Sequence, residues 1–360
     1  MADGALAMSH GGLLEDELTR LGLRHEDVLD VSVNVNPYGS FPPVIEAIRA
    51  ASLERYPDPS ASPARAALAR WLGLPREQVV VGNGAVDLLW SLARCLVGPA
   101  DLVLVVEPAF SELRLAAKRA GARIVEHRLD ADDDFALHPA ALEAALRTCK
   151  PRLVYLSTPA NPTGKTTPIE LLVRLADDHP QTTFVVDLSF SSLSEGHRDD
   201  VVHASGRIVW LRSLTKDFAL AGLRVGFAVA PPQIARQIEA SRPPWSVNAL
   251  AQAAACAVTT TAAQAFVAES RARLLGDRKA LELALGRLGL ATHASKTIYT
   301  LVDLGPARRA TPLRDALLAR HAVLVRDGTS FGLPHHVRIC ARPAAQSRRL
   351  IQALARELNR

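Results

Sequence analysis

The sequence predicts an α/β fold in which helices cover both faces of a mostly parallel sheet, together with a second, smaller α+β domain. Three observations support this prediction. Between about residues 60 and 215, short strands, several of them apolar on both faces, alternate with amphipathic helices, which is typical of a parallel sheet buried on both faces. The chain has 360 residues, enough for two domains. Beyond Pro244 the alternation gives way to long alanine- and arginine-rich helices and short alternating strands.

The elements of the first part follow in order along the chain. The first forty residues predict a helix up to about Leu23, and then a short strand in DVLDVSVNVNPYG that ends in a Pro/Gly turn. A helix near Pro63–Leu72 precedes the sheet. The strands expected in the sheet are QVVVG, DLVLVVEP, ARIVEHRL, RLVYLS, TFVVDLSF and RIVWLRS, and the helices expected among them are AVDLLWSLARCL, SELRLAAKRAG, LHPAALEAALR and Ile169–Asp178.

The last part of the chain predicts helices over about Val247–Leu285 and then strands in TIYTLVDL, AVLVRD and HVRICA. We therefore expect three units. Residues 1–45 form an N-terminal segment that packs on the small domain, residues 46–250 form the large domain, and residues 251–360 form the small domain. In a doubly wound sheet, ligands bind at the carboxyl ends of the strands, so we expect the functional site there.

Composition excludes several classes of function. The net charge is 42 − 37 = +5, the basic residues are scattered and aromatic residues make up only 5%, so we expect no nucleic-acid partner. The chain begins without the charged start and apolar core of a signal peptide and has no apolar run of about 20 residues, so we expect a cytoplasmic protein with no membrane partner. The cysteines are widely spaced and predict neither a disulfide frame nor a metal site: they are Cys95, Cys149, Cys256 and Cys340.

Two glycine- and proline-bearing turns follow strands of the predicted sheet. In GNGAVD the exposed amides of Gly84, Ala85 and Val86 can bind an anion at the amino end of the next helix. The alternative is an ordinary glycine turn, in which Asp87 stabilises the first helical turn. In TPANPTG two prolines hold the backbone stiff and direct the amide of Asn161, although a tight loop that only reverses the chain has the same pattern.

Two charged residues also stand at strand ends. Asp187 ends the apolar strand of TFVVDLSF, where a buried carboxylate needs a cationic or donating partner; a cap for the following loop is the alternative. Lys216 follows the apolar run RIVWLRS and lies near Ser213 and Arg224. A lysine in such a place is partly desolvated, which lowers its pKa.

Together the four features suit one ligand, pyridoxal 5′-phosphate. Lys216 would bind the aldehyde covalently, because desolvation makes its amine available as a nucleophile. Asp187 would keep the ring nitrogen protonated, which makes the ring an electron sink for a carbanion at the substrate Cα. Arg224 and Ser213 would neutralise the phosphate together with the amides at Gly84–Val86.

Over nearly the whole chain, NPTG, the strand-ending aspartate and SLTKDFALAGLRVG resemble the fold-type I aminotransferase superfamily in order and spacing. The resemblance implies a pyridoxal-phosphate enzyme with a seven-stranded large domain and a homodimer with shared active sites. The catalytic residues implied are Lys216 and Asp187, and the cofactor-binding residues implied are Gly84, Ala85, Val86, Phe110 stacked on the ring, Asn161 at the 3′-oxygen, Asp187, Ser213, Lys216, Arg224 and Tyr56 from the partner subunit.

Further stretches resemble two related families. HGG, VSVNVNPYG, RYPDP, PPWSVNALAQAA, VLVRDGTSFGLP and VRICAR resemble the cobalamin-pathway L-threonine-O-3-phosphate decarboxylases, and histidinol-phosphate aminotransferases share the NPYG and RYPDP patterns. Phe190 stands where aminotransferases commonly have a tyrosine and the decarboxylases usually have phenylalanine. Leu188 and Ser189 depart from the Glu-Ala that both families usually have after the aspartate.

The resemblance also implies the substrate contacts. Arg338 would bind the substrate carboxylate through two parallel hydrogen bonds, and Arg326 and His10 would bind its phosphate. Alternatively, Arg326 pairs with Asp327 or Asp303, and His10 is a frayed terminal residue. The activity expected first is decarboxylation of L-threonine O-3-phosphate to (R)-1-aminopropan-2-ol O-2-phosphate and carbon dioxide. The alternatives are an aminotransferase for a phosphorylated amino compound such as histidinol phosphate and, remotely, a non-catalytic regulator with this fold.

Overall fold

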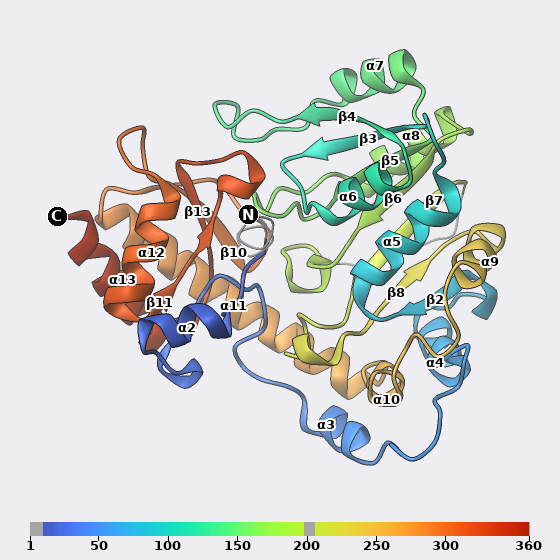
Figure 1. Cartoon of the computed structure of the whole chain (residues 1–360), viewed down its shortest axis with the longest axis horizontal. Helices are drawn as coiled ribbons and strands as arrows, with labels where there is room; N and C mark the ends of the chain where they lie inside the picture. Colours follow the sequence, from blue (N-terminus) through green and yellow to red (C-terminus); the bar gives the residue numbers. More distant parts are fainter. Residues whose placement is uncertain (1–9, 198–205, 360) are drawn as a thin grey trace.

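A seven-stranded sheet forms the centre of the larger part of the molecule (Figure 1). The computed structural model describes residues 10–197 and 206–359, so residues 1–9 of the expected N-terminal segment lie outside the described residues. The strand order is β2-β8-β7-β6-β5-β3-β4, and β8 alone in this sheet runs antiparallel to its neighbours, which confirms the predicted mostly parallel sheet. The strands are β2 (Val79–Gly82), β3 (Leu102–Glu107), β4 (Arg123–Arg128), β5 (Leu153–Ser157), β6 (Thr183–Asp187), β7 (Ile208–Ser213) and β8 (Gly226–Val229).

Alternate residues of these strands pack on opposite faces of the sheet, because successive side chains of a strand point to opposite sides. On one face, Val103 and Val185 join a cluster with the helices α5 (Gly84–Leu96), α6 (Glu112–Arg119) and α9 (Pro232–Ala240). On the other, Leu104 and Phe184 join α4 (Ser62–Leu72), α7 (Pro139–Cys149), α8 (Ile169–Asp178) and α10 (Ala249–Ala257). Burial on both faces explains why the strands read as continuous apolar runs.

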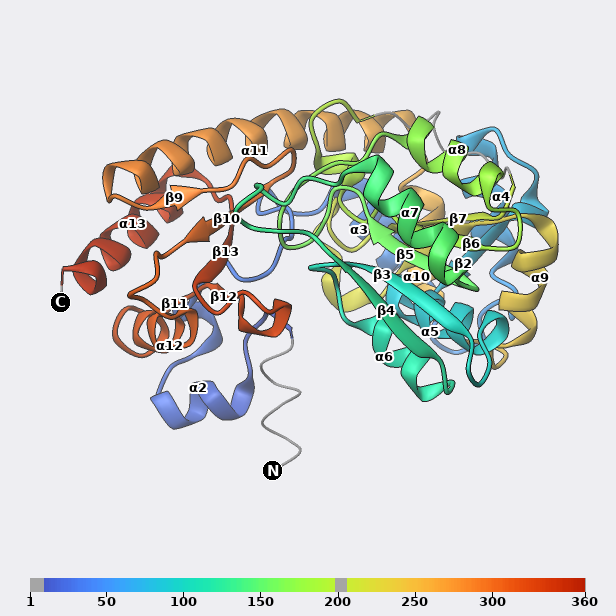
Figure 2. The same ribbon diagram turned by 90° about the horizontal axis from the view of Figure 1, so that it is seen from above.

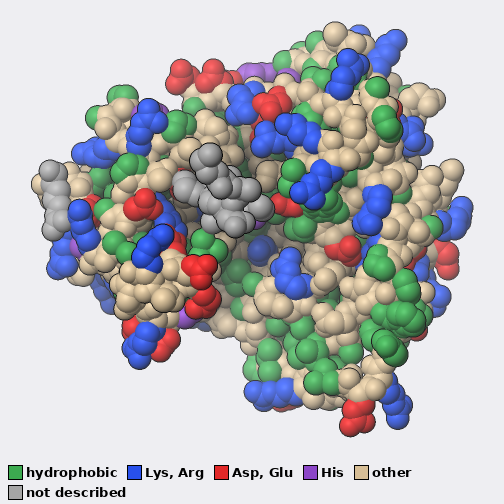
Figure 3. Space-filling view, viewed as in Figure 1, with side chains coloured by type: hydrophobic (Ala, Val, Ile, Leu, Met, Phe, Trp, Pro, Cys, Tyr) green, Lys and Arg blue, Asp and Glu red, His purple; other side chains and the backbone are tan. Residues whose placement is uncertain are grey.

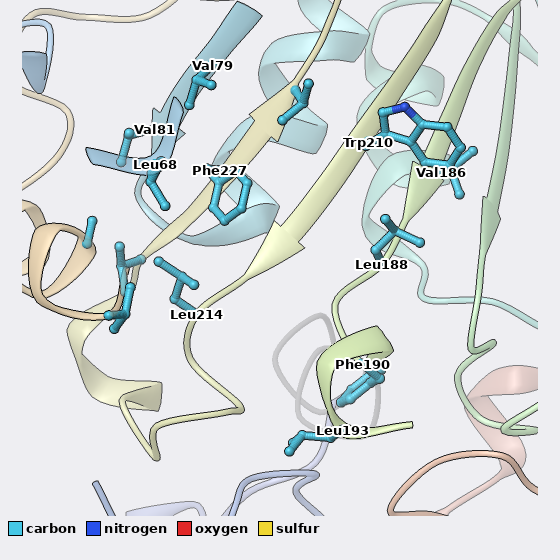
Figure 4. Packing of buried hydrophobic residues seen from close by; sticks show 14 of the residues in the cluster. Leu68, Val79, Val81, Val186, Leu188, Phe190, Leu193, Trp210, Leu214 and Phe227 are labelled. Carbon is cyan, nitrogen blue, oxygen red and sulfur yellow. The ribbon is translucent and has the colours of Figure 1, made fainter. Parts of the chain in front are cut away.

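The second of these clusters continues to the carboxyl ends of the central strands. Trp210 on β7, which is fully buried, lies beside Val186 on β6 (Figure 4). Leu188 and Phe190 extend the same apolar packing beyond the end of β6, towards the short helix η3 (Ser191–Leu193). The loop that follows Asp187 is therefore held by buried side chains, which fixes the position of the strand end.

The smaller part contains a four-stranded antiparallel sheet in the order β12-β13-β10-β9. Its strands are β9 (Ala291–Thr292), β10 (Tyr299–Asp303), β12 (Arg326–Asp327) and β13 (His336–Cys340), and its helices are α2 (Glu15–Leu21), α12 (Ala310–His321) and α13 (Ala344–Leu358). The single strand expected in AVLVRD is divided in two, because Val323–Leu324 (β11) pairs in parallel with Leu29–Asp30 (β1) whereas β12 pairs with β13.

The segment after β1 contacts the larger part. The backbone N–H of Asn36 donates to the carbonyl of Lys216 at 3.0 Å, and its side-chain Nδ2 donates to the carbonyl of Asp217 at 2.9 Å. Ser40 Oγ donates to the carbonyl of Phe218 at 2.5 Å. The helix α3 (Pro42–Arg49) then packs against α10. The N-terminal segment thus contacts both parts, and the domain boundaries stay a prediction.

The long helix α11 (Thr261–Arg287) joins the two parts (Figure 2). Val267 near its start packs in the core of the large sheet, and Leu285 near its end packs in the core of the small one. The side chain of Thr260 accepts a hydrogen bond from the N–H of Ala263 and begins the helix. No single helix among residues 10–197 and 206–359 is long and apolar enough to cross a membrane, although α10 and α11, bent by 83° at their junction, pass that test together by length and composition.

A loop between β4 and α7 also joins the two parts. Phe135 of this loop is 1% exposed and packs in a cluster with Leu301, Phe331 and Leu333 of the smaller part. The preceding residue, Asp134, accepts a hydrogen bond from His293 at a 2.9 Å separation. An aromatic ring from a loop of the larger part is therefore buried among side chains of the smaller part.

Replacing Phe135 with alanine is expected to lower the free energy of unfolding by about 3–5 kcal/mol, the usual cost of removing a buried phenylalanine side chain. The measurement is urea denaturation followed by circular dichroism. Leu53→Ala is the control, because Leu53 is 79% exposed and its truncation should change stability by less than about 0.5 kcal/mol. A loss below about 1 kcal/mol in Phe135→Ala would show that the loop does not stabilise the fold.

Candidate active site

A cavity of about 540 Å³ lies at the carboxyl ends of the central strands. It receives side chains from both parts, and the surface view shows the hollow between them with Lys and Arg side chains around it (Figure 3). Its volume is in the range of small-molecule sites. Its lining residues are His10, Gly11, Ser32, Val33, Asn34, Val86, Phe110, Glu112, Asn161, Phe190, Lys216, Arg224, Arg326, Phe331 and Arg338. Most of the residues predicted from the sequence are thus brought together.

Lys216 lies three residues beyond the end of β7 and lines this cavity. Burial, the largest cause, and the positive charges of Arg224 and Arg338 together lower the pKa of its amine to about 8, against the attraction of Asp187. The bond from Asn36 fixes its backbone carbonyl. A large fraction of this amine is therefore neutral near pH 8 and available as a nucleophile or base.

Asp187 ends β6, the neighbour of β7, and is buried. Its Oδ1 accepts the backbone N–H of Ser189 at 2.8 Å, and its Oδ2 accepts the hydroxyl of Tyr155 at 3.2 Å. Burial raises the pKa of this carboxyl, although the hydrogen bonds from Ser189 and Tyr155 and the charge of Lys216 oppose the rise. A buried carboxylate with neutral donors only is poised to accept a cationic partner.

The start of α5 and the segment before β8 form a cradle for an anion. Gly84 has φ +80°, and a Cβ there would lie 2.8 Å from Nη2 of Arg224. A Cβ on Gly226 would lie 2.8 Å from the backbone nitrogen of Ala85. The two glycines therefore allow the helix N-terminus and the guanidinium to approach one another closely. Ser213, whose hydroxyl lies 2.6 Å from that of Thr215, ends the neighbouring strand β7.

Arg338 is a buried cation on β13. Its Nη1 donates to Oδ1 of Asn161 and its Nη2 donates to the carbonyl of Ser32. Within the described part of the chain, its buried Nε has no hydrogen-bond partner. Burial lowers the pKa of this guanidinium. Because its protein partners are neutral acceptors, Arg338 is suited to bind an anionic group of a ligand.

Arg326 lies directly opposite Arg338 in the β12–β13 pair. Its Nη2 donates to Oγ of Ser330 at 2.6 Å, and its guanidinium lies 4.9 Å from the ring centre of Phe331. Burial and the charge of Arg338 lower its pKa to about 10. The carboxylate of Asp327, the alternative partner expected from the sequence, accepts from Thr311 Oγ1 at 2.6 Å and from the N–H of Thr329 at 2.7 Å.

Three site residues were not singled out by sequence reasoning. Asn34 is 3% exposed, lines the cavity, and neither atom of its amide has a hydrogen-bond partner in residues 10–197 and 206–359. Glu112 lines the cavity next to His10, with which it forms a 3.0 Å ion pair. Tyr155 supports Asp187 from β5. The two asparagines of VSVNVN, spaced two residues apart, could have pointed to Asn34 as a site residue. Tyr155 has no such signal, because in the sequence it is one of several large residues in an apolar strand.

The structure does not bring Tyr56 into this cavity. Tyr56 is 83% exposed, and its ring lies 4.9 Å from that of Trp245, which is itself exposed. Neither residue lines the cavity described above. The contribution of Tyr56 to a neighbouring subunit stays a prediction.

The chain is similar to known proteins over nearly its whole length. The family model described as "Aminotransferase class I and II" matches residues 26–354. The chain belongs to this family. It is 35% identical over 349 residues to the histidinol-phosphate aminotransferase of Symbiobacterium thermophilum, covering 96% of this chain and 94% of that protein.

Two solved structures have the same fold over more than nine tenths of this chain. The histidinol-phosphate aminotransferase of Sinorhizobium meliloti in complex with pyridoxal-5′-phosphate superposes with a TM-score of 0.87 at 25% identity, covering 98% of this chain and 96% of that one. The L-threonine-O-3-phosphate decarboxylase of Porphyromonas gingivalis superposes with a TM-score of 0.80 at 27% identity, covering 92% and 100%. These matches confirm the predicted fold-type I architecture.

As in other class I and II aminotransferases, the cofactor is pyridoxal phosphate, and the protein is a pyridoxal-phosphate enzyme. The residues fit this cofactor. Gly84 and Arg224 leave a cradle for its phosphate that a side chain at position 84 would fill. Asp187 is a buried carboxylate whose hydrogen bonds within residues 10–197 and 206–359 come from the neutral donors Tyr155 and Ser189, and Lys216 has an amine of lowered pKa. The individual roles remain proposals.

Replacing Gly84 with alanine is expected to weaken cofactor binding about 10-fold. The Cβ of alanine would displace the Arg224 guanidinium from the cradle, and the loss of one hydrogen bond to a charged group costs about 1.5–3 kcal/mol. Kd is measured by titrating the cofactor-free protein with pyridoxal phosphate. Gly222→Ala is the matched control, since a Cβ at that position meets nothing within 4 Å. Equal Kd values for both variants would exclude the cradle.

Proposed function

We propose that the protein is a pyridoxal-phosphate-dependent aminotransferase that acts on a phosphorylated amino compound such as histidinol phosphate. The observation that carries the proposal is the pair of buried cations, Arg326 and Arg338, side by side on neighbouring strands at the cavity. Two buried guanidinium groups favour substrates with anionic ends. The phosphate of histidinol phosphate, its one anionic group, and the two carboxylates of a dicarboxylic 2-oxo acid can each be bound by these guanidinium groups. The relatives named as histidinol-phosphate aminotransferases support the proposal.

The side chains around the cavity have distinct tasks in this reaction. When bound, the cofactor supplies an electron-withdrawing ring that acidifies the substrate Cα–H bond. Lys216, in its neutral form, would act as the general base that takes the proton from the substrate Cα onto its amine. Asp187 holds a proton at the ring nitrogen. Arg326 would bind the phosphate of histidinol phosphate, and Arg338 and Arg326 together would bind the two carboxylates of the 2-oxo acid; these contacts orient the Cα–H bond.

Decarboxylation of threonine phosphate, the activity expected first from the sequence, becomes the second candidate. One observation favours it. Phe190 lines the cavity and packs edge-on against Tyr299 at 5.1 Å, so this position offers no hydroxyl of the kind that aminotransferases commonly have. The similarity to the Porphyromonas gingivalis decarboxylase also supports this candidate. Arg338 and Arg326 would then hold the carboxylate and the phosphate of a single substrate.

One experiment separates the two candidates. The purified protein with pyridoxal phosphate is incubated with L-histidinol phosphate and 2-oxoglutarate, and in parallel with L-threonine O-3-phosphate and no 2-oxo acid. Glutamate formation in the first reaction supports the aminotransferase. Carbon dioxide and an amino alcohol phosphate in the second would establish the decarboxylase instead. Turnover in neither reaction would contradict both proposals and favour the non-catalytic alternative.

We also propose that the protein works as a cytoplasmic homodimer. The exposed aromatic pair of Tyr56 and Trp245 supports this proposal, because side chains of this size are usually covered in an assembly. Light scattering on the purified protein should give twice the mass of one chain, 38.7 kDa. A monomer that binds cofactor and is fully active would contradict the shared site.

A further inference from the structure

Glu112 is a carboxylate fixed from two sides at the edge of the cavity. It is the first residue of α6, where the helix N-terminus favours a negative charge. Its Oε2 accepts the indole N–H of Trp90 at 2.7 Å, and its Oε1 lies 3.0 Å from Nε2 of His10. The hydrogen bond with His10 is the main cause that lowers the pKa of Glu112. With 12% of its side chain exposed, Glu112 has little contact with solvent.

The backbone next to His10 is held by Ser32, which follows strand β1. The N–H of Gly12 donates to Oγ of Ser32 at 2.9 Å, and a Cβ on Gly11 would lie 2.7 Å from the carbonyl oxygen of Ser32. The same carbonyl accepts the bond from Arg338. Residues 10–12 therefore run from the wall that holds Arg338 to the helix that holds Glu112.

His10 lines two adjoining cavities. Its ring centre is 5.4 Å from that of Phe110, and it lines the cavity together with Arg326. His10 and Arg326 also line an adjoining cavity of about 560 Å³, so they stand at the junction of the two spaces. Because Nε2 faces Glu112, Nδ1 is the imidazole nitrogen that remains for a ligand.

We propose that Glu112 is a positioning residue that clamps His10 across the cavity, so that Nδ1 of His10 and the guanidinium of Arg326 bind the phosphate of the substrate together. The proposal rests on the proposed function, since it assumes a phosphorylated substrate. Glu112 itself does not touch that substrate. It acts by fixing the ring of His10 and the nitrogen that the ring presents, in the way that a carboxylate orients a catalytic or ligating histidine elsewhere.

The test is a double-mutant cycle with Glu112→Ala, His10→Ala and the double variant, measured with histidinol phosphate and with unphosphorylated histidinol. Each single variant should raise KM for the phosphorylated compound about 10-fold, the effect of losing one charge-assisted hydrogen bond, and leave kcat within about twofold. The double variant should also lose about 10-fold, because both changes remove one interaction. A loss of about 100-fold in the double variant, or equal losses with both compounds, would overturn the proposal.

Two further variants protect the test against a folding defect. Trp90→Phe keeps the ring and removes one hydrogen bond to Glu112, so it should raise the same KM by about twofold to threefold. Glu126→Gln is the matched control, since Glu126 bonds Arg114 and Arg128 and does not line the cavity, and its KM should equal that of the parent. A higher KM in Glu126→Gln than in Trp90→Phe would contradict the assigned role.

Hydrogen exchange of the holoenzyme without substrate tests the clamp independently of the reaction. The peptide that covers residues 10–18 should exchange about 10-fold faster in Glu112→Ala and in His10→Ala than in the parent. If the parent turns over no phosphorylated compound but both variants exchange faster, the proposed function fails and the clamp stands. Unchanged exchange in both variants would refute the clamp whatever the substrate is.

Discussion

Replacing Lys216 with alanine is expected to lower kcat by about 10⁴-fold, because the change removes the group that we propose as both nucleophile and general base. Borohydride treatment should then no longer attach pyridoxal phosphate to the chain, which mass spectrometry of the reduced protein measures. Lys296→Ala is the matched control, since this lysine is exposed and pairs with Glu195. A Lys216→Ala variant with parental kcat would eliminate the whole mechanism.

The pH dependence of cofactor attachment tests the environment of the same lysine. A neutral amine attacks the aldehyde, and the pKa of Lys216 is lowered to about 8. The attachment rate of the cofactor-free protein should therefore rise with pH and reach half of its maximum near pH 8. Arg224→Gln removes a positive charge that lowers this pKa, so its midpoint should lie at a higher pH. A parental midpoint near 10 would show that the amine is not desolvated.

The architecture of the large sheet could be predicted from the sequence because strands that are buried on both faces contain continuous apolar stretches. The stretches LVYL and IVWL are apolar at every position, and each lies in a strand that pairs in parallel within the observed sheet. The short strands of the smaller part were less predictable. AVLVRD contains two strands with different partners, and a local pattern cannot specify the partner of a strand.

Several residues that line the cavity could be predicted from the sequence, because a charged or polar residue just beyond an apolar strand is easy to recognise; their roles stay predictions. Lys216 and Arg338 line one cavity, although 122 positions separate them in the chain. Glu112 and Tyr155 were missed for a physical reason. Each is hydrogen-bonded to another side chain of the site, His10 in one case and Asp187 in the other. Such pairs depend on helix and strand placement that a single sequence does not display.

Replacing Asp187 with asparagine is expected to have opposite effects on the enzyme with and without its cofactor. Burial raises the pKa of this carboxyl, so its charged form is disfavoured in the fold, and the stability linked to its titration is lost as the pH rises through that raised pKa. Near pH 7 the cofactor-free Asp187→Asn protein should therefore be at least as stable as the parent, because the isosteric amide carries no charge to bury. Thermal unfolding of the two cofactor-free proteins measures this.

With the cofactor present, the same variant should lose kcat on the order of 10³-fold, the scale of removing one preorganised electrostatic partner from a reacting group. A neutral amide cannot hold the proton at the ring nitrogen as a carboxylate does. Glu107→Gln is the matched control, because Glu107 is also buried with a raised pKa and does not line the cavity; it should alter stability but keep kcat within a few-fold. Full activity in Asp187→Asn, or a cofactor-free variant much less stable than the parent, would show that Asp187 has a structural role only. A variant that is stable but inactive would show that the carboxylate destabilises the cofactor-free fold and is needed for the reaction.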